Sequence, residues 1–183
     1  MRQKPPFIAK INRPVLSGYF PRKRLFRLLD DCRKRQVAWV SGPPGSGKTT
    51  LVGSYLDSRN LPCIWYQVDE GDADVATFFY YMGLAVQRAA PRNRRPLPLL
   101  APENIPGMAE FTRRYFEGLY ARLRPGSVLV FDNCQKAPAG SLFHEVIRDG
   151  LSCLPEGVSA ILLSRSDPPP PFSPGFAPIA SWR

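Results

Sequence analysis

Short apolar runs alternate with longer amphipathic stretches along the chain. The apolar runs have the length of strands buried inside a sheet, and they cover residues 37–40, 63–68, 127–132 and 158–163. The amphipathic stretches repeat their apolar residues at helical spacing, and they cover residues 22–35, 49–59, 75–89, 108–123 and 141–154. Because the two kinds of segment alternate, the pattern predicts an α/β fold with a mostly parallel sheet.

Acidic residues mark the connection between the second predicted strand and the helix over 75–89. Asp69-Glu70-Gly71-Asp72 is typical of a turn, and Asp74 is placed to cap the helix that follows. The aromatic residues of this helix and of the helix over 108–123 recur at helical spacing. This spacing favours packing in a core over a platform on which bases would stack.

The composition is that of one globular domain with its own core. The sequence has 183 residues, of which 44% are hydrophobic, enough for a single domain. We expect a leading segment over residues 1–21, a nucleotide-binding domain over 22–167, and a proline-rich tail or linker over 168–183. The longest apolar runs are only as long as strands, so no segment is expected to span a membrane.

The cysteines indicate a reducing compartment. Cys32, Cys63, Cys134 and Cys153 lie far apart and include no C-x-x-C pair, so we expect neither a zinc site nor structural disulfides. The basic N-terminus is not followed by the apolar segment of a secretory signal. Together, these features predict a cytoplasmic protein.

A formal net charge of +10 raises the question of nucleic acid binding, because Lys and Arg neutralise phosphates. The basic residues form separate clusters, at residues 22–24, 33–35, 92–95, 113–114 and 122–124. No helix-turn-helix pattern, zinc-finger spacing or RNP-type strand accompanies them. The clusters are more typical of solvated helix faces than of a nucleic acid site.

One segment matches the phosphate-binding P-loop G-x-x-x-x-G-K-[ST] in both sequence and context. The segment consists of Gly42, Pro43, Pro44, Gly45, Ser46, Gly47, Lys48, Thr49 and Thr50. A predicted strand precedes it and a predicted helix follows, so backbone N–H groups and the helix N-terminus can face a β-phosphate. Lys48 would then contact the β- and γ-phosphates of ATP, and the Thr49 hydroxyl would ligate Mg²⁺.

The third apolar run ends in Asp132, followed by Asn133. The carboxyl ends of parallel strands lie at one edge of a sheet, so Asp132 is expected beside the P-loop. There its carboxylate would hold Mg²⁺ through water, as in a Walker B element. The fourth run is followed by Arg165, which could approach a γ-phosphate from the same edge. An ordinary loop arginine is equally consistent with the sequence.

These motifs together resemble the NTPase domain of MalT-like, LuxR-type transcription activators, within the STAND class of P-loop NTPases. The resemblance covers about residues 8–167. Besides the P-loop and the Walker B strand, it rests on Lys10-Ile11-Asn12-Arg13-Pro14, Arg22-Lys23-Arg24-Leu25, WYQVDEGD over 65–72, Phe78 to Tyr81, and Leu163-Ser164-Arg165.

The resemblance implies a P-loop NTPase three-layer sandwich that works as an ATP-driven switch. The domain would hold ADP at rest, and ATP together with an inducer would permit self-association of a larger protein. Phe20 to Arg24, with Arg22 as the nucleotide contact, would lie near the adenine side of the site, and Arg165 would sense the γ-phosphate. DNA would be contacted only through a C-terminal domain outside residues 1–183.

Two positions depart from the family pattern. The first motif usually reads apolar-Gly-Arg-Glu, whereas Pro21 and Lys23 flank Arg22 here, which leaves the contact of Arg22 with the base open. The Walker B Asp is usually followed by a second acid, and Asn133 takes that place. An amide can orient water but cannot accept its proton. We therefore expect ATP and ADP to bind and hydrolysis to be slow, unless Glu70 or a partner supplies the missing carboxylate.

The sheet is expected to be incomplete. The sequence offers four strands where the resembled family has five core strands, and the prolines of 168–183 argue against a central strand there. We therefore expect the chain to be truncated before the last core strand.

Two other functions stay open. Asn133 favours a non-hydrolysing nucleotide-binding scaffold, and the P-loop alone is equally found in small-molecule kinases, which also need an Arg-rich lid.

Overall fold

The centre of the fold is a parallel sheet with the strand order β2-β3-β4-β1-β5. The computed structural model describes residues 7–16, 18–93, 95–169, 172 and 177–179, the last range for its backbone only. The strands are β1 Val37–Ser41, β2 Cys63–Gln67, β3 Val128–Asp132, β4 Ser159–Ser164 and β5 Ala177–Ile179. Each of the four strands expected from the sequence is present within one or two residues.

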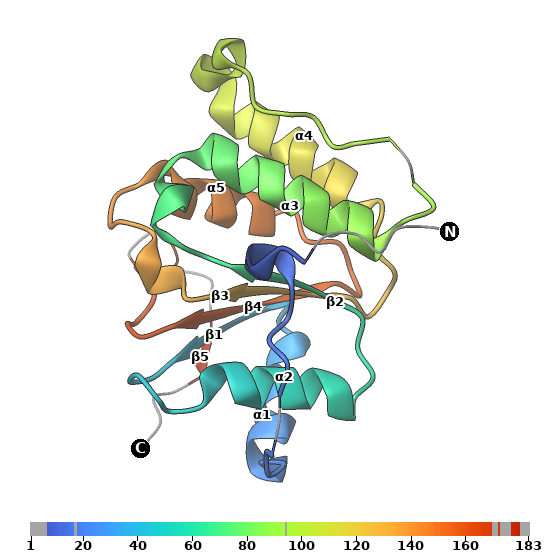
Figure 1. Ribbon diagram of the computed structural model, residues 1–183, viewed down its shortest axis with the longest axis vertical. Helices are drawn as coiled ribbons and strands as arrows, with labels where there is room; N and C mark the ends of the chain where they lie inside the picture. The colour runs from blue at the N-terminus through green and yellow to red at the C-terminus, as the bar shows by residue number, and fades with distance from the viewer. Residues whose placement is uncertain (1–6, 17, 94, 170–171, 173–176, 180–183) are drawn as a thin grey trace.

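Helices cover both faces of this sheet and give three layers (Figure 1). One face carries α1 Lys23–Arg33 and α2 Lys48–Ser58, and the other carries α3 Val75–Ala89, α4 Met108–Tyr120 and α5 Leu142–Leu151. Short 3-10 helices occupy four connections, at η1 Ala9–Ile11, η2 Glu70–Ala73, η3 Pro102–Gly107 and η4 Cys134–Lys136. The α/β three-layer sandwich predicted from the sequence is confirmed. Among the described residues, no helix has both the length and the apolar character needed to cross a lipid bilayer.

Each face of the sheet has its own apolar core. The larger core lies under α3, α4 and α5, and the aromatic residues of these helices are packed into it. Phe78 of α3 and Phe116 of α4 are fully buried, and their ring centroids lie 6.4 Å apart. The packing role expected for these aromatic residues is therefore confirmed.

The expectation of a four-stranded sheet is wrong. Ala177–Ile179 forms a fifth strand, β5, which runs parallel to β1 with Pro178 opposite Trp39. Because β5 lies at the edge of the sheet, only one of its sides pairs, and an edge strand tolerates the missing N–H of proline. Residues 177–179, which lie in the segment expected to be a tail or linker, therefore belong to the sheet, and the expectation that the sheet ends before its fifth strand is corrected.

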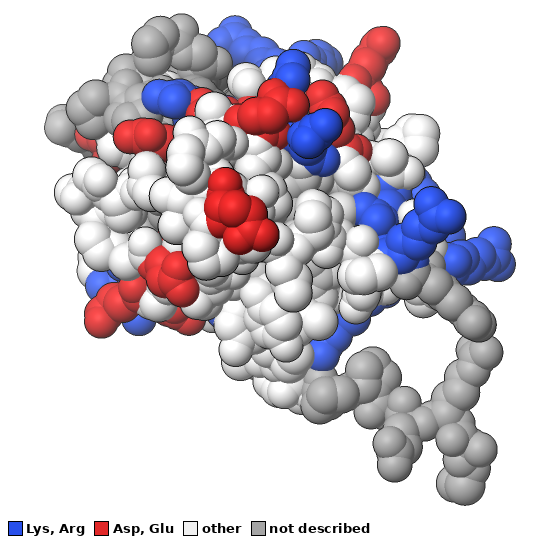
Figure 2. Space-filling model, turned by 90° about the horizontal axis from the view of Figure 1, so that it is seen from above, with Lys and Arg blue, Asp and Glu red and all other residues white. Residues whose placement is uncertain are grey.

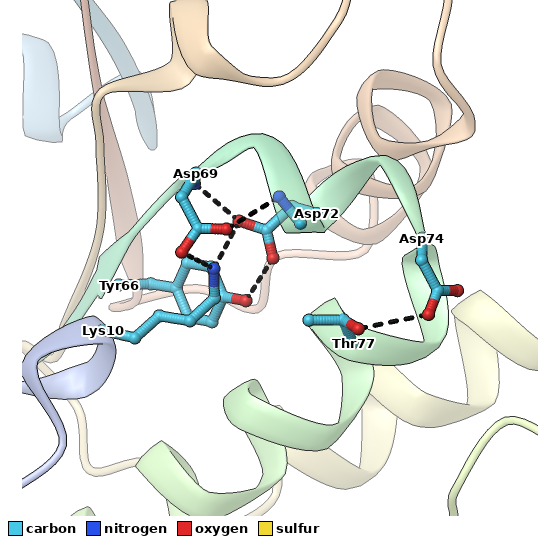
Figure 3. A network of polar contacts seen from close by, with 7 residues as sticks. Lys10, Tyr66, Asp69, Asp72, Asp74 and Thr77 are labelled. Atoms are coloured by element: carbon cyan, nitrogen blue, oxygen red, sulfur yellow. Dashed lines mark hydrogen bonds and ion pairs between the residues drawn. The ribbon is translucent and has the colours of Figure 1, made fainter.

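The described residues 7–16 of the N-terminal segment, blue in Figure 1, pass the opposite edge of the sheet, where η1 contacts β2. Lys10 of η1 anchors it: the Lys10 ammonium lies 2.6 Å from the Asp69 carboxylate and 2.8 Å from the Asp72 carboxylate (Figure 3). Asp72 has no exposed side-chain surface, and it also accepts a hydrogen bond from the Tyr66 hydroxyl at 2.7 Å. This cluster joins the N-terminal segment to the connection between β2 and α3.

The acids of this connection also have the local roles predicted for them. The Asp69 carboxylate accepts a hydrogen bond from the Gly71 N–H, and the Asp72 carboxylate accepts one from the Asp69 N–H, so the two residues cap η2. Asp74 caps α3, because its carboxylate accepts a hydrogen bond from the Ala76 N–H at 3.1 Å. The turn and capping roles are therefore confirmed.

Replacement of Lys10 tests how much the cluster of Lys10, Asp69 and Asp72 contributes to the stability of the fold. Lys10→Met would leave the charge of buried Asp72 without its cation, so we expect the free energy of unfolding to fall by about 3 kcal/mol or more. Chemical denaturation followed by circular dichroism measures the change. The matched control is Lys34→Met, which removes an exposed ion pair with Asp31 and should leave the midpoint nearly unchanged. Equal effects of the two substitutions would contradict a special role of the cluster.

Candidate nucleotide-binding site

Polar residues gather where the carboxyl ends of β1, β3 and β4 meet. The P-loop connects β1 to α2, Asp132 is the last residue of β3, and Arg165 follows the last residue of β4. Because these three strands are neighbours and parallel, the residues that follow them come out at the same edge of the sheet. As the sequence pattern predicts, the P-loop, Asp132 and Arg165 therefore lie at the same edge of the sheet.

The P-loop has the backbone of an anion-binding turn. Gly45 and Gly47 have φ angles of 74° and 81°, in the left-handed region that favours glycine. Gly47 is the N-cap of α2, and no side chain caps that end of the helix. The first N–H groups of α2 are therefore open to an anionic ligand, and the helix dipole favours negative charge there.

The Lys48 side chain folds back over the P-loop. Its ammonium donates hydrogen bonds to the Gly42 carbonyl at 2.6 Å, to the Pro43 carbonyl at 3.0 Å and to the Ser46 hydroxyl at 3.3 Å. Burial lowers the pKa of Lys48, and the positive charge of nearby Arg165 lowers it further. Phosphate oxygens would replace these neutral acceptors by charged ones, and charge-assisted hydrogen bonds are roughly twice as strong.

Thr49 and Asp132 are in direct contact, as expected for a P-loop beside a Walker B strand. The Thr49 hydroxyl donates a hydrogen bond to the Asp132 carboxylate at 3.0 Å. Asp132 is only 3% exposed, and this burial raises its pKa, although the hydrogen bond from Thr49 acts in the opposite direction. A hydroxyl and a carboxylate oxygen are ligands that Mg²⁺ accepts. The pair therefore fits a magnesium ion held against phosphates.

Asn133 has an unusual backbone conformation. Its φ angle is 65°, in the left-handed region, where asparagine is far more at ease than residues with longer or branched side chains. Asn133 directly follows Asp132 and begins η4 as its N-cap. The local backbone thus gives a reason for asparagine at this position besides any role in chemistry.

Gln135 connects two of the candidate residues, Asn133 and Arg165. Its side-chain oxygen accepts a hydrogen bond from the Arg165 N–H at 3.0 Å, and its side-chain nitrogen donates to the Asn133 side-chain oxygen at 3.4 Å. The glutamine therefore joins the end of β4 to the residue after β3. The sequence suggests that Gln135 could help to position water, but no local pattern indicates this link, because its two partners follow different strands.

The other candidate residues take different positions. Arg22 lies beside the P-loop, because its guanidinium is 3.7 Å from the point where a Cβ atom on Gly47 would stand. Arg165 is exposed at the end of β4. Glu70, considered as a substitute for the missing carboxylate, is exposed on η2 after the end of β2. The structure thus gathers Arg22, the P-loop, the Thr49–Asp132 pair and Arg165 around one edge.

The chain is similar in sequence to a transcriptional regulator. No protein-family model matches it. It is 28% identical over 162 residues to the HTH-type transcriptional regulator MalT of Cronobacter sakazakii (strain ATCC BAA-894). The aligned region covers 87% of this chain and 18% of MalT, so the chain spans less than a fifth of the length of that relative. The match confirms the MalT-like resemblance found in the motifs.

Two solved structures are similar in their arrangement of elements. The Aeropyrum pernix ORC1 protein in complex with DNA has a TM-score of 0.48 and 18% identity, covering 81% of this chain and 40% of that one. C. elegans PCH-2 has a TM-score of 0.35 and 13% identity, and the match covers 79% of this chain and 35% of PCH-2. With scores this low, neither likeness bears on function. The strand order and the place of the P-loop after β1 are themselves those of an α/β P-loop NTPase fold.

The buried charge of Asp132 leads to a prediction about stability. Because burial raises the pKa of Asp132, its ionised carboxylate opposes folding at neutral pH. Asp132→Asn keeps the shape and removes the charge, so we expect the ligand-free variant to melt at a higher temperature than the wild type at pH 7. The difference should shrink as the pH falls, and it should vanish below the ordinary pKa of Asp, about 3.9, where the carboxyl group is protonated in both the folded and the unfolded state.

The control for this experiment is a second aspartate at the same edge. Asp167 is exposed and accepts a hydrogen bond from the Ser41 hydroxyl at 3.2 Å, so Asp167→Asn should bring no gain in melting temperature. Differential scanning calorimetry over a series of pH values measures both variants. A lower melting temperature for Asp132→Asn than for the wild type would contradict the cost assigned to the buried charge.

Proposed function

We propose that the domain is the ATP-binding switch of a signal-responsive transcription regulator. The observation that carries the proposal is the contact between Thr49 and Asp132 beside Lys48. This contact brings together, at one edge of a parallel sheet, a cation for phosphates and two oxygen ligands for a metal. The likeness to MalT supports the regulatory part of the proposal.

Each residue of the site has a distinct role in this proposal. Lys48 and the first N–H groups of α2 bind the β- and γ-phosphates of ATP, and Thr49 and Asp132 hold Mg²⁺. When bound, Mg²⁺ neutralises part of the charge on the β- and γ-phosphate oxygens. Arg22 borders the P-loop, and Phe20, which is 91% exposed two residues before it, offers a ring on which the adenine can stack.

The difference between ATP and ADP acts through Arg165. Only ATP offers a γ-phosphate with which the Arg165 guanidinium can pair. ATP therefore binds more tightly to the arrangement in which Arg165 faces the P-loop than to other arrangements, whereas ADP does not distinguish between them. Gln135 carries a displacement of this strand end to Asn133, because its side chain contacts both residues. In this proposal the ATP-bound arrangement is the one that self-associates in the full regulator.

Hydrolysis is slow in this proposal, because Asn133 stands where a second carboxylate would assist the attacking water. General-base assistance typically contributes about 10² to 10⁴ in rate. The same observation favours a second candidate function, a scaffold that binds nucleotide and does not hydrolyse it. The two candidates share the nucleotide site and differ only in turnover.

Replacement of the P-loop lysine tests nucleotide binding. Lys48→Ala removes the charge that pairs with the phosphates, so we expect the affinity for ATP to fall at least about tenfold, or about 1.4 kcal/mol. Isothermal titration calorimetry measures the change. The control is Lys136→Ala, which removes an exposed lysine on η4 and should leave the affinity unchanged. Unchanged affinity in a folded Lys48→Ala variant would contradict the assignment of the P-loop.

Replacement of Asn133 separates the two candidate functions. If the missing carboxylate limits hydrolysis, Asn133→Asp should raise steady-state ATPase activity by about tenfold or more, without tightening ATP binding. Aspartate is the better choice than glutamate, because short polar side chains tolerate the left-handed backbone here.

The chain provides a matched control for this substitution. Asn60 also has a left-handed backbone, with φ of 50°, and it lies just beyond the carboxyl end of α2. Asn60→Asp should leave ATPase activity unchanged. If neither variant hydrolyses ATP while both bind it, the scaffold is the better account of the site.

A further inference from the structure

The positive charge of the chain is concentrated on one side of the fold. Residues 22–35, which form α1 and its flanks, contain seven Arg or Lys and two Asp, a net charge of +5 and half of the +10 of the whole chain. Residues 69–167, which include α3, α4 and α5, contain eleven basic and twelve acidic residues. Seen from above, the face over α4 carries both signs of charge side by side (Figure 2). The basic cluster around α1 therefore carries a net positive charge, whereas the basic clusters of the α3, α4 and α5 side are balanced by acidic residues.

Five cations of α1 and the turn after it point away from the sheet. Phe26 and Leu29 of α1 are buried against the sheet, so the opposite side of the helix faces solvent. Lys23 and Lys34 are eleven residues apart, which is close to three helical turns and about 16 Å. The exposed cations of this side, which we call the α1 basic face, are Lys23, Arg24, Arg27, Lys34 and Arg35.

Few carboxylates neutralise the α1 basic face. Within the described part of the chain, Lys34 is its one member held in an ion pair, with Asp31 at 2.8 Å, and both partners are exposed. Asp30, the other acid of the segment, pairs instead with Arg59, the C-cap residue of α2, at 2.6 Å. The face therefore keeps most of its positive charge.

A hollow extends the α1 basic face at the carboxyl end of the helix. It has a volume of about 690 Å³ and lies at the amino ends of β1 and β4, on the side of the sheet away from the P-loop. Arg33, Lys34 and Arg35 line it, and Arg33 donates a hydrogen bond to the Ser159 hydroxyl at 3.4 Å. Glu156 is the one acid among its lining residues. The hollow thus adds Arg33 to the row of cations.

We propose that the α1 basic face binds the phosphate backbone of duplex DNA without reading its sequence. Duplex DNA presents one negative charge per about 1.7 Å of its axis, so a row of cations about 16 Å long faces several phosphates at once. An acidic protein partner fits less well, because protein interfaces have an apolar centre. Leu28, at 42% exposure, is the one exposed large hydrophobic residue of α1.

This contact is separate from the nucleotide site and does not rest on the proposed switch. Within the proposed regulator it adds affinity for DNA near the target, while base recognition belongs to another part of the protein. Arg22, which is not part of the α1 basic face, lies beside the P-loop, and Lys23 and Arg24 directly follow it in sequence, so the test uses the cations further along the face. Failure of DNA binding and failure of nucleotide binding are then distinguishable.

The test is the salt dependence of DNA binding. Fluorescence anisotropy with a short labelled duplex of arbitrary sequence should give a dissociation constant of about 10⁻⁴ to 10⁻⁶ M for the wild type near physiological salt. Each phosphate contact contributes about 0.9 to the slope of log K against log salt, so the triple variant Arg27→Gln, Lys34→Gln, Arg35→Gln should lower that slope by about 2 to 3. Its affinity for ATP and its melting temperature should stay those of the wild type.

The control removes the same charge from the other side of the fold. Arg92, Arg113 and Arg114 are exposed on the α3 and α4 side, and their joint replacement by Gln should leave the slope nearly unchanged. An equal decrease of the salt-dependence slope in both triple variants would overturn the proposal, because the net charge of the chain alone would then explain DNA binding. The proposal is also overturned if the wild type does not bind the duplex, or if it binds polyglutamate or phosphatidylserine vesicles as tightly as the duplex.

Discussion

Parallel pairing of β3, β4 and β1 is the constraint on which the candidate site depends. It places the end of β3, the end of β4 and the P-loop after β1 at one edge of the sheet. Thr49 and Asp132 are 83 residues apart in sequence, yet this pairing brings them to hydrogen-bonding distance. A slip of one residue in the register of β3 would turn Asp132 to the other face of the sheet and separate the pair.

The charges at this edge are arranged for a ligand more than for stability. Burial raises the pKa of Asp132 and lowers the pKa of Lys48, so the charged form of each group is held at a cost to the folded state. Such costs are common at functional sites, where the ligand offsets them on binding. The cluster of Lys10 with Asp69 and Asp72 differs, because its charges are paired within the protein and hold the N-terminal segment in place.

Local sequence predicted most of the layers and the P-loop, because apolar runs, the glycines of the loop and the cap at Asp74 are local signals. It missed β5, because the prolines of 168–183 argue against a central strand and sequence does not show that this strand lies at the edge. It also missed the link that Gln135 makes between Asn133 and Arg165. The sequence analysis assigned the basic clusters 22–24 and 33–35 to solvated helix faces, and only the fold shows that the exposed cations share the side of α1 opposite buried Phe26 and Leu29.

The central claim is that one nucleotide binds at the P-loop with a metal held by Thr49 and Asp132. Calorimetric titration of the wild-type protein with ATP, with Mg²⁺ present and with Mg²⁺ chelated, tests it most directly. The account predicts one ATP bound per chain, with an affinity at least about tenfold weaker when Mg²⁺ is removed. Absence of binding, or binding of equal strength with and without Mg²⁺, would contradict it.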